Sequence, residues 1–393
     1  MLIAQRLAHF QESVIRDMAR LAVQHQAINL SQGFPDFPMH ESIHAAALQA
    51  ITQGLNQYTV TWGYPPLRQK LAELYTERLG WSVDPELHVT VTVGVSEGIA
   101  AAMLATLNPG DEIIILEPAH DNFRPSAFLA GAVPVAVPLE PPHYRFDPAR
   151  LRAAVNSRTR ALLLNTPHNP SGRVFDTHEL DIITDLVLQH DLLLITDEIY
   201  DQILYDGRRH VSPGSRPELR GQTITMSGLG KTYALTGWRL GYVIAPAELS
   251  QGIRQVHDYL TLCAPTPFQA AAVAALNLPP SYHDANRQGY HERRALMLSI
   301  LQQAGFKARQ PEGTYYVMAD YSHVPIPQAE WTPREFARWL TIEGGVAGVP
   351  GDSFYSLPGY GEREIRFAFP KKLDTLQEAG SRLMALVDKY GAK

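Results

Sequence analysis

Cysteine is almost absent from this chain: Cys263 is the only one among 393 residues, so no disulfide can form within the chain. Disulfides belong to oxidising compartments, and their absence favours a reducing one, the cytoplasm. Long apolar runs are missing too. Stretches such as 192–195 are far too short to cross a bilayer, and the N-terminus lacks the apolar core of a secretory signal. We therefore expect a cytoplasmic protein with no membrane segment.

No block of basic residues interrupts the sequence. Lys and Arg number 34 against 40 Asp and Glu, a formal net charge of −6, which argues against nucleic acid as a partner. Hydrophobic residues make up 45% and charged residues 19% of the chain, as in ordinary globular proteins. At roughly 150 residues per domain, the length predicts about two domains.

The middle of the chain alternates short apolar runs with helical patterns such as 97–107 and 180–190. Apolar strands that alternate with helices predict an α/β fold with a mostly parallel sheet and helices on both faces. In such sheets ligands bind beyond the carboxyl ends of the strands. The expected strands are 88–93, 112–116, 160–164, 192–196, 223–226 and 242–245.

The pattern changes after about residue 280. A long helical stretch, 287–305, leads into the strand-like pieces 314–320 and 364–369, which predicts a second, smaller α+β domain. The first 45 residues do not fit the sheet pattern, and we expect them to pack with the C-terminal part. The predicted division is 1–45 for an N-terminal arm and part of the small domain, 46–280 for a large ligand-binding domain and 281–393 for the small domain.

Glycine and polar residues gather at three expected strand ends. The turn 93–98 carries Val95 and Ser96 at a helix start whose free N–H groups would attract a phosphate, although many such turns carry glycine for geometry alone. The loop 165–172 contains two Asn and two Pro, which make it rigid and rich in polar side chains. Asn169 can therefore offer an amide donor at a fixed point. Asp197 ends a buried apolar strand, where it forms a salt bridge, caps a helix or holds a protonated heterocycle.

Three basic residues lie near glycine or in apolar strands, where they suggest ligand binding. Lys231 lies beside glycine in the segment 227–241 without the spacing of a P-loop. Desolvation at a strand end would leave its amine neutral and able to form a Schiff base. Arg239, eight residues later, could clamp a phosphate. Arg366 lies in the apolar strand 364–369, where it pairs with an internal acid or binds a ligand carboxylate.

Taken together, these motifs resemble the class I aminotransferases of fold type I, which depend on pyridoxal 5′-phosphate (PLP). The resemblance is greatest to the methionine, kynurenine and glutamine–phenylpyruvate aminotransferases. It runs through INLSQGFPDFP at 28–38, NQYT at 56–59, NTPHNPSG, TDEIY, GKTYALTGWRLGY and IRFAF, and so covers nearly the whole chain. It implies a PLP enzyme that moves an amino group from an L-amino acid to a 2-oxo acid.

The resemblance also implies roles around the cofactor ring. Lys231 is then the Schiff-base lysine that shuttles the substrate proton. Asp197 pairs with the pyridinium nitrogen and keeps it protonated, which makes the ring an electron sink. Asn169 and Tyr200 would hydrogen-bond the phenolic oxygen. No metal is expected.

The remaining implied roles concern the phosphate and the substrate. Arg239 and the amides of Val95 and Ser96 would hold the phosphate, and Tyr58 would reach the phosphate of the neighbouring subunit in a homodimer with shared sites. The residues implied at the substrate α-carboxylate are Gly33, Asn169 and Arg366.

Two positions depart from the family pattern. Gly228 replaces the serine that commonly precedes the lysine by three residues, and Ser227 is the neighbouring candidate for the lost phosphate contact. His120 stands where the family stacks Tyr or Phe on the cofactor ring, with Phe123 as the alternative stacking residue. Because a histidine replaces the usual tyrosine or phenylalanine, the preferred reaction stays open.

Three functions are compatible with these motifs to different degrees. Transamination is favoured, with methionine or aromatic donors, because no second arginine for a side-chain carboxylate stands out. The alternative on the same scaffold is PLP-dependent β-elimination, a C–S lyase reaction. A regulator built on this fold would carry an added N-terminal DNA-binding domain, for which a family motif starting at residue 28 leaves no room.

Overall fold

An eight-stranded sheet forms the centre of the protein, which we describe for residues 4–10 and 12–391 from a computed structural model. Its strand order is β2-β9-β8-β7-β6-β3-β4-β5. The strands span Val89–Val93 (β2), Glu112–Glu117 (β3), Val133–Glu140 (β4), Arg145–Phe146 (β5), Thr159–Asn165 (β6), Leu193–Asp197 (β7), Thr223–Gly228 (β8) and Leu240–Ile244 (β9). The five strands from β8 to β4 are parallel, whereas β9 runs antiparallel to both of its neighbours. The predicted α/β class is confirmed.

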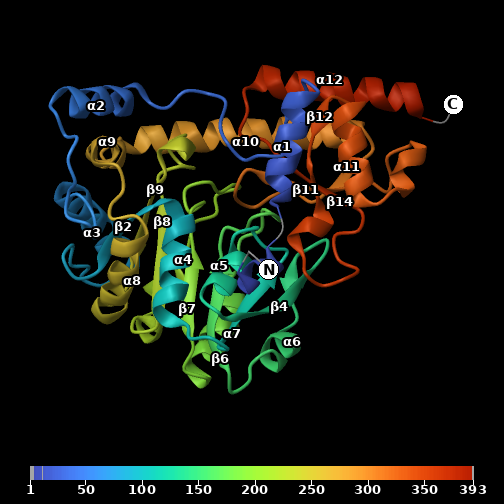
Figure 1. The fold of residues 1–393 in the computed structure, drawn as a ribbon. Helices are drawn as coiled ribbons and strands as arrows, with labels where there is room; N and C mark the ends of the chain where they lie inside the picture. The colour runs from blue at the N-terminus through green and yellow to red at the C-terminus, as the bar shows by residue number, and fades with distance from the viewer. Residues whose placement is uncertain (1–3, 11, 392–393) are drawn as a thin grey trace.

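Helices cover both faces of this sheet (Figure 1). One face packs on α4, α5 and α8, and the other on α6 and α7. A third group of helices, α2, α3 and α9, lies at the β2 end of the sheet. Their bounds are Glu41–Thr52 (α2), Pro65–Leu79 (α3), Gly94–Thr106 (α4), Phe123–Leu129 (α5), Pro148–Ala153 (α6), Thr177–Gln189 (α7), Ala247–Leu260 (α8) and Thr266–Leu276 (α9). Because both faces are covered, β3, β6 and β7 carry runs of consecutive apolar residues.

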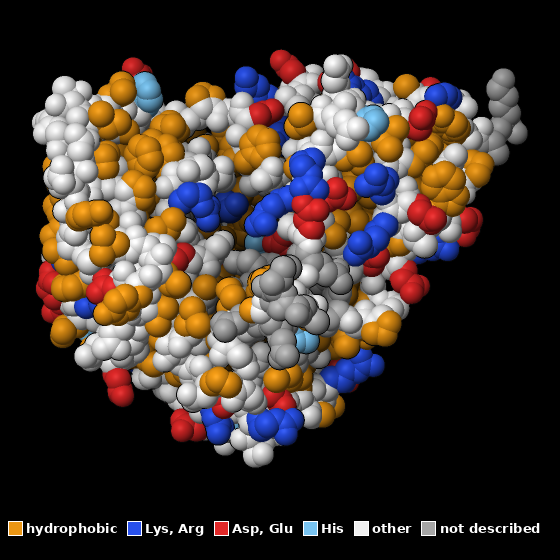
Figure 2. All heavy atoms as spheres, in the orientation of Figure 1, with side chains coloured by type: hydrophobic (Ala, Val, Ile, Leu, Met, Phe, Trp, Pro, Cys, Tyr) orange, Lys and Arg blue, Asp and Glu red, His pale blue; other side chains and the backbone are white. Residues whose placement is uncertain are grey.

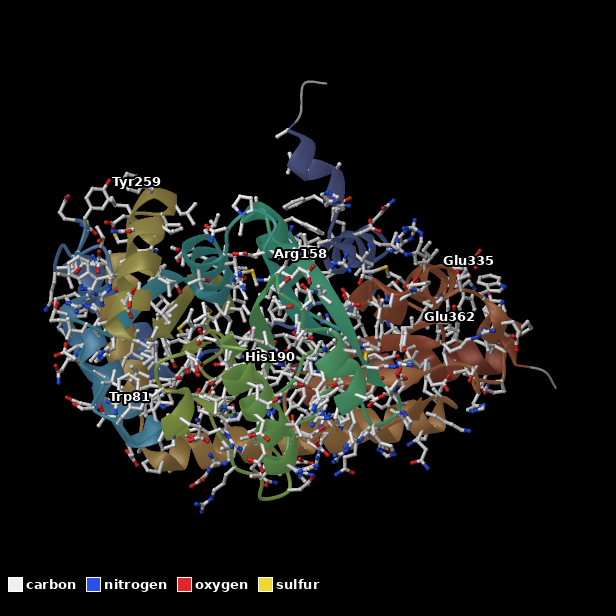
Figure 3. The ribbon with its side chains drawn as sticks, turned by 90° about the horizontal axis from the view of Figure 1, so that it is seen from below. Trp81, Arg158, His190, Tyr259, Glu335 and Glu362 are labelled. Carbon is white, nitrogen blue, oxygen red and sulfur yellow. The ribbon has the colours of Figure 1, made fainter. Side chains whose placement is uncertain are left out.

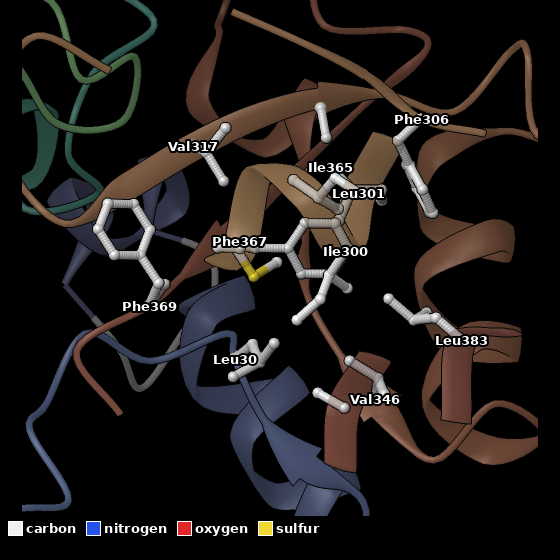
Figure 4. Close-up of a cluster of buried hydrophobic side chains, with 14 of the residues drawn as sticks. Leu30, Ile300, Leu301, Phe306, Val317, Val346, Ile365, Phe367, Phe369 and Leu383 are labelled. Carbon is white, nitrogen blue, oxygen red and sulfur yellow. The ribbon is translucent and has the colours of Figure 1, made fainter. Parts of the chain in front are cut away.

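A second, antiparallel sheet has the order β10-β11-β14-β13. Its strands are Lys307–Ala308, Tyr316–Asp320, Glu364–Ala368 and Val349–Pro350, respectively. The helices α10 (Pro280–Gln303), α11 (Pro333–Ile342) and α12 (Leu373–Tyr390) surround it. Phe306, Val317, Ile365 and Phe367 meet Leu301 of α10 and Leu383 of α12 in its core (Figure 4).

The N-terminal segment packs with the C-terminal part of the chain. Helix α1 (Val14–Gln24) lies on α11, and β1 (Ile28–Asn29) pairs in parallel with β12 (Val346–Ala347). The short 3-10 helix η1 (Gln5–His9) instead contacts α5, where the His9 ring stacks on Phe128 at 4.7 Å. The N-terminal segment therefore runs from one sheet to the other.

The described part of the chain contains no helix that is both long and apolar enough to cross a membrane. The strand ends that matter for function are those of β6, β7 and β8, which place Asn165, Asp197 and Gly228 along one edge of the large sheet.

Candidate active site

Lys231 lies just beyond β8, beside the rings of two tyrosines. Its Nζ is 5.9 Å from the ring centres of both Tyr200 and Tyr315 and donates to the Gly33 carbonyl oxygen at 3.4 Å. Desolvation by burial is the main reason that the pKa of the Lys231 amine is lowered. A lower pKa increases the neutral, nucleophilic fraction of the amine.

Asp197, at the end of β7, is a buried carboxylate without a cationic partner. Its side chain accepts a hydrogen bond from the backbone N–H of Ile199 at 3.2 Å, and no Lys, Arg or His nitrogen of the described residues lies within 4.0 Å. Burial raises its pKa from 3.8 to about 7, while nearby Lys231 acts in the opposite direction. An acid in this state fits a site for a cationic ring nitrogen, which would restore its charge.

The start of α4 and Arg239 form a tight backbone cradle. Gly94 has φ +73°, and a Cβ there would overlap the Arg239 guanidinium. A Cβ on Gly241 of β9 would press on the backbone of Gly94 and Val95. The arrangement brings an arginine to the first turn of a helix, where the N–H groups of Val95 and Ser96 have no partner within the helix. These donors suit a phosphate.

Arg366 is the opposite case to Asp197, a buried cation without an anionic partner. The side chain is 1% exposed and lies between the rings of Tyr316 and Phe354, at 4.2 and 4.8 Å. Its Nη1 donates to Asn169 Oδ1 at 2.9 Å and its Nη2 to the Ser31 carbonyl at 2.7 Å. The Nε atom has no partner, and no carboxylate of the described residues lies within 4.0 Å. The free donors fit a carboxylate ligand.

Asn169 links Arg366 to the strand that carries Asp197. Its oxygen accepts from Arg366, so its amide nitrogen remains a donor for another ligand atom. Its backbone N–H donates to Asn165 Oδ1 at 2.7 Å, and Asn165 Nδ2 donates to the Asp197 carbonyl at 2.8 Å. The rigid loop expected from the sequence is thus anchored to the strand that carries Asp197.

Tyr315 and Tyr316 belong to the site but were not predicted from the sequence. Tyr200 Oη donates to Tyr316 Oη at 3.3 Å, and Tyr315 Oη donates to the Gly33 carbonyl at 2.9 Å. Gly33 has no space for a side chain, because a Cβ would overlap the Tyr316 hydroxyl. Both tyrosines lie in the predicted strand-like piece 314–320, but their position beside Lys231 depends on how the two sheets pack.

His120 lines a cleft of about 580 Å³ between the N-terminal segment and the end of β3. The cleft is bordered by Val14, Ile15, Phe354 and several charged residues, and Figure 2 shows Lys and Arg side chains gathered near the hollowed middle of this face. Desolvation is the main reason that the pKa of His120 is lowered, with Arg366 and Lys231 lowering it further against Asp121 and Asn122. The imidazole is therefore neutral at neutral pH.

Ser227 and Tyr58 are the two remaining residues expected at the cofactor phosphate. Ser227 Oγ is buried and donates to the Glu198 carbonyl at 3.3 Å. Tyr58 is 78% exposed. The phosphate contacts of both residues stay predictions.

Comparison with known proteins identifies one family. The family model for aminotransferase class I and II matches residues 25–383. The chain is 37% identical over 382 residues to methionine aminotransferase of Escherichia coli, with 97% of both chains covered. It is 36% identical over 409 residues to human kynurenine–oxoglutarate transaminase 1, again with 97% of both covered.

Solved structures give the same result. A structure of the Escherichia coli methionine aminotransferase superimposes with a TM-score of 0.92 at 36% identity, covering 98% of this chain and 100% of that one. The N-succinyldiaminopimelate aminotransferase of Mycobacterium tuberculosis superimposes with a TM-score of 0.93 at 37% identity, with the same coverage.

Proposed function

The chain belongs to the class I and II aminotransferases, which depend on PLP, and we propose that methionine-like and aromatic L-amino acids are its donors and that Lys231 carries its cofactor. Its activity as an aminotransferase follows from the family and from relatives that are themselves transaminases. The donor class and the roles of individual residues are the proposal.

One observation supports these roles most strongly: the site contains a buried acid and a buried base, and neither has an ionic partner among the described residues. Asp197 lacks a cation and Arg366 lacks an anion among the described residues. Each alone would be destabilising. A pyridinium nitrogen would compensate the first, and the α-carboxylate of an amino acid would compensate the second.

The other residues would orient the cofactor and move the proton. PLP, when bound, withdraws electrons from the substrate Cα and so makes the Cα proton acidic. Arg239 and the first N–H groups of α4 would bind its phosphate, at Val95 and Ser96. Asn169 Nδ2 and Tyr200 Oη would donate to its phenolic oxygen, and His120 would stack on its ring.

Lys231 and Arg366 would act on the substrate. Lys231 would accept the Cα proton on its neutral amine, for which its lowered pKa is suitable. Arg366 would hold the carboxylate with its free donors, beside Gly33 and Asn169. Fixing both ends of the amino acid keeps the Cα–H bond oriented toward Lys231.

The surroundings of the cleft support an uncharged substrate side chain. Arg124 pairs with Glu117 at 3.2 Å and Arg334 with Asp352 at 3.5 Å, whereas Val14 and Ile15 line the cleft beside His120. Arg124 and Arg334 are thus already engaged by acids of the chain, and Arg16 is the third arginine that lines the cleft.

A panel of amino donors and 2-oxo acids tests this proposal. Single-turnover loss of the cofactor colour should be fastest with methionine and aromatic amino acids, and each should yield its 2-oxo acid and a new amino acid. A faster reaction with aspartate or glutamate would contradict the donor class. Release of pyruvate and thiol from a cysteine S-conjugate measures β-elimination, the alternative reaction on the same scaffold.

We also propose a homodimer with shared sites. Exposed apolar residues gather where the segment 57–61 meets the end of α8, an arrangement held by the hydrogen bond from His257 Nε2 to the Thr61 carbonyl at 2.9 Å. Tyr58 is 78% and Tyr259 is 95% exposed, and Tyr259 stands out at the edge of the molecule in Figure 3. A partner copy would cover this surface.

We also propose a domain division and a location in the cell. The division into 1–45, 46–280 and 281–393 is supported by the two distinct sheets and by the packing of Met18, Leu21 and Leu30 in the core of the small sheet. A cytoplasmic location is supported by the single cysteine, Cys263.

A further inference from the structure

Two residues at helix starts around the His120 cleft do not cap their helices. Ser13 precedes α1 and Asn122 precedes α5, and both are residue types that normally bond the N–H groups of the first turn. Neither side chain does so. Ser13 Oγ instead donates to Asp121, and Asn122 Oδ1 lies 2.5 Å from His120 Nδ1. Both side chains therefore contact neighbouring residues of the cleft in place of the helix backbone.

The contact with Asn122 favours one tautomer of His120. The Asn122 amide oxygen lies 2.5 Å from Nδ1, and an oxygen at that distance is best met by an N–H at Nδ1. A carboxylate oxygen of Asp121 also lies 3.4 Å from Nδ1 and would repel a lone pair there. The backbone N–H of Asn122 favours the other tautomer, but at 3.4 Å it is the weaker contact. The proton thus belongs on Nδ1.

The second ring nitrogen is then a free acceptor. Among the described residues, Nε2 of His120 has no hydrogen-bond partner, while one third of the side chain remains exposed in the cleft. Asp121, Lys231 and Arg366 are the charged groups that act on this ring.

We propose that Asn122 is a positioning residue that fixes His120 in the cleft as the neutral tautomer with the proton on Nδ1. The inference rests on the proposed stacking of the cofactor on His120. Asn122 contacts the ring at Nδ1 on its edge, which leaves Nε2 as the acceptor without a partner among the described residues. A histidine at this position needs such an anchor, because a ring that rotates about its Cβ–Cγ bond offers no stable stacking face.

The tautomer is measured first, independently of activity. Protein labelled with ¹⁵N-histidine, with and without PLP, should give a His120 signal with a protonated Nδ1 and an unprotonated Nε2. The His120→Phe variant assigns that signal among the 15 histidines. A proton on Nε2 alone, or an imidazolium at neutral pH, would overturn the proposal.

The role of Asn122 is then tested in PLP binding to the full chain. Asn122→Ala should lower the affinity for PLP roughly fivefold in the wild-type background. In the His120→Phe background it should leave the affinity unchanged, because coupled residues give non-additive effects. Asn122→Ser keeps a good helix-capping residue but is too short to hold the ring. It should behave like Ala if Asn122 positions His120, and like wild type if Asn122 merely supports α5.

These outcomes separate the inference from the function on which it rests. If His120→Ala binds PLP as tightly as wild type, the stacking assignment is wrong. If His120→Ala loses affinity while Asn122→Ala binds normally and keeps the Nδ1 proton, the stack stands and the role of Asn122 is wrong. Asn122→Asp adds a further readout: a carboxylate should favour the imidazolium and move the His120 titration to higher pH.

Discussion

Arg366 Nη1 and Asn169 Oδ1 lie 2.9 Å apart, although 197 residues separate them in the chain. The contact connects a strand of the small sheet with the loop that follows β6 of the large one. It turns the Asn169 amide oxygen toward the group proposed to bind the substrate carboxylate. The amide nitrogen is thereby left for the cofactor, so one side chain joins the two binding sites.

Replacing Arg366 should separate substrate binding from cofactor binding. Arg366→Lys is expected to raise KM for the amino donor roughly 100-fold, since a lysine cannot reproduce a two-pronged contact with a carboxylate and about 3 kcal/mol of binding is lost. The cofactor colour should persist. Steady-state kinetics and the absorbance spectrum measure the two effects.

Arg363→Lys is the matched control, because Arg363 lies near Arg366 but contacts Glu330 and the Ala329 carbonyl at the surface. It should leave KM unchanged. Equal reaction of the wild type with an amino acid and with its decarboxylated amine would contradict the role of Arg366.

PLP-free protein should become less stable as pH rises, because of Asp197. Its pKa is raised from 3.8 to about 7, so the folded chain retains a proton that the unfolded chain has lost. This stabilisation is complete below the unfolded pKa and disappears as pH rises through the folded pKa. Between about pH 5 and about pH 8 the loss is roughly 2–3 kcal/mol.

Thermal unfolding of PLP-free wild type and Asp197→Asn at both pH values isolates this contribution, and the variant should be less sensitive to pH. Glu364→Gln is the control, because it removes another carboxyl whose pKa is raised to about 7 and leaves the Asp197 contribution in place. An identical pH dependence for wild type and Asp197→Asn would show that Asp197 is not protonated in the empty site.

His120 should tolerate another aromatic ring better than a small side chain. His120→Phe is expected to keep PLP and much of the turnover, since stacking depends on dispersion and shape. His120→Ala should weaken PLP binding about tenfold, or ~1.4 kcal/mol. Equilibrium dialysis of PLP and the absorbance spectrum are the measurements.

The opposite pattern would change the interpretation of the site. If His120→Phe binds PLP normally but loses nearly all turnover, the imidazole itself transfers a proton. The preference for simple transamination would then need revision.

Sharing of the active site between subunits can be tested with hybrid dimers. Tyr58→Phe and Lys231→Ala proteins, mixed under conditions of subunit exchange, should form hybrids with one doubly damaged site and one site of wild-type composition. Titration with PLP should then show a tight site that binds the cofactor as the wild type does. If exchange is demonstrated and no such site forms, Tyr58 does not cross the interface.

Much of the fold could be predicted because local pattern and burial agree. The runs 112–116, 160–164 and 192–196 became β3, β6 and β7, since strands covered on both faces must be apolar throughout. The antiparallel direction of β9 was not predicted. Its apolar run resembles that of a parallel strand, and only the long-range pairing with β2 and β8 distinguishes them.

The site was predictable in its chemistry and less so in its contacts. Lys231, Asp197 and Arg366 stood out because a charge in an apolar strand or glycine turn requires a partner. Their neighbours Tyr315 and Tyr316 did not, because tyrosine is common in cores and carries no such signal. Ser227 illustrates the limit, since the sequence places it beside the cleft and only the structure reveals its bond to the Glu198 carbonyl.

The position of the covalent anchor tests this account most directly. Purified protein loaded with PLP should be yellow, and reduction with borohydride followed by peptide mapping should place the label on Lys231 alone. Lys231→Ala, treated in the same way, should carry no label. A label on any other lysine of the wild type would contradict the assignment of the active site.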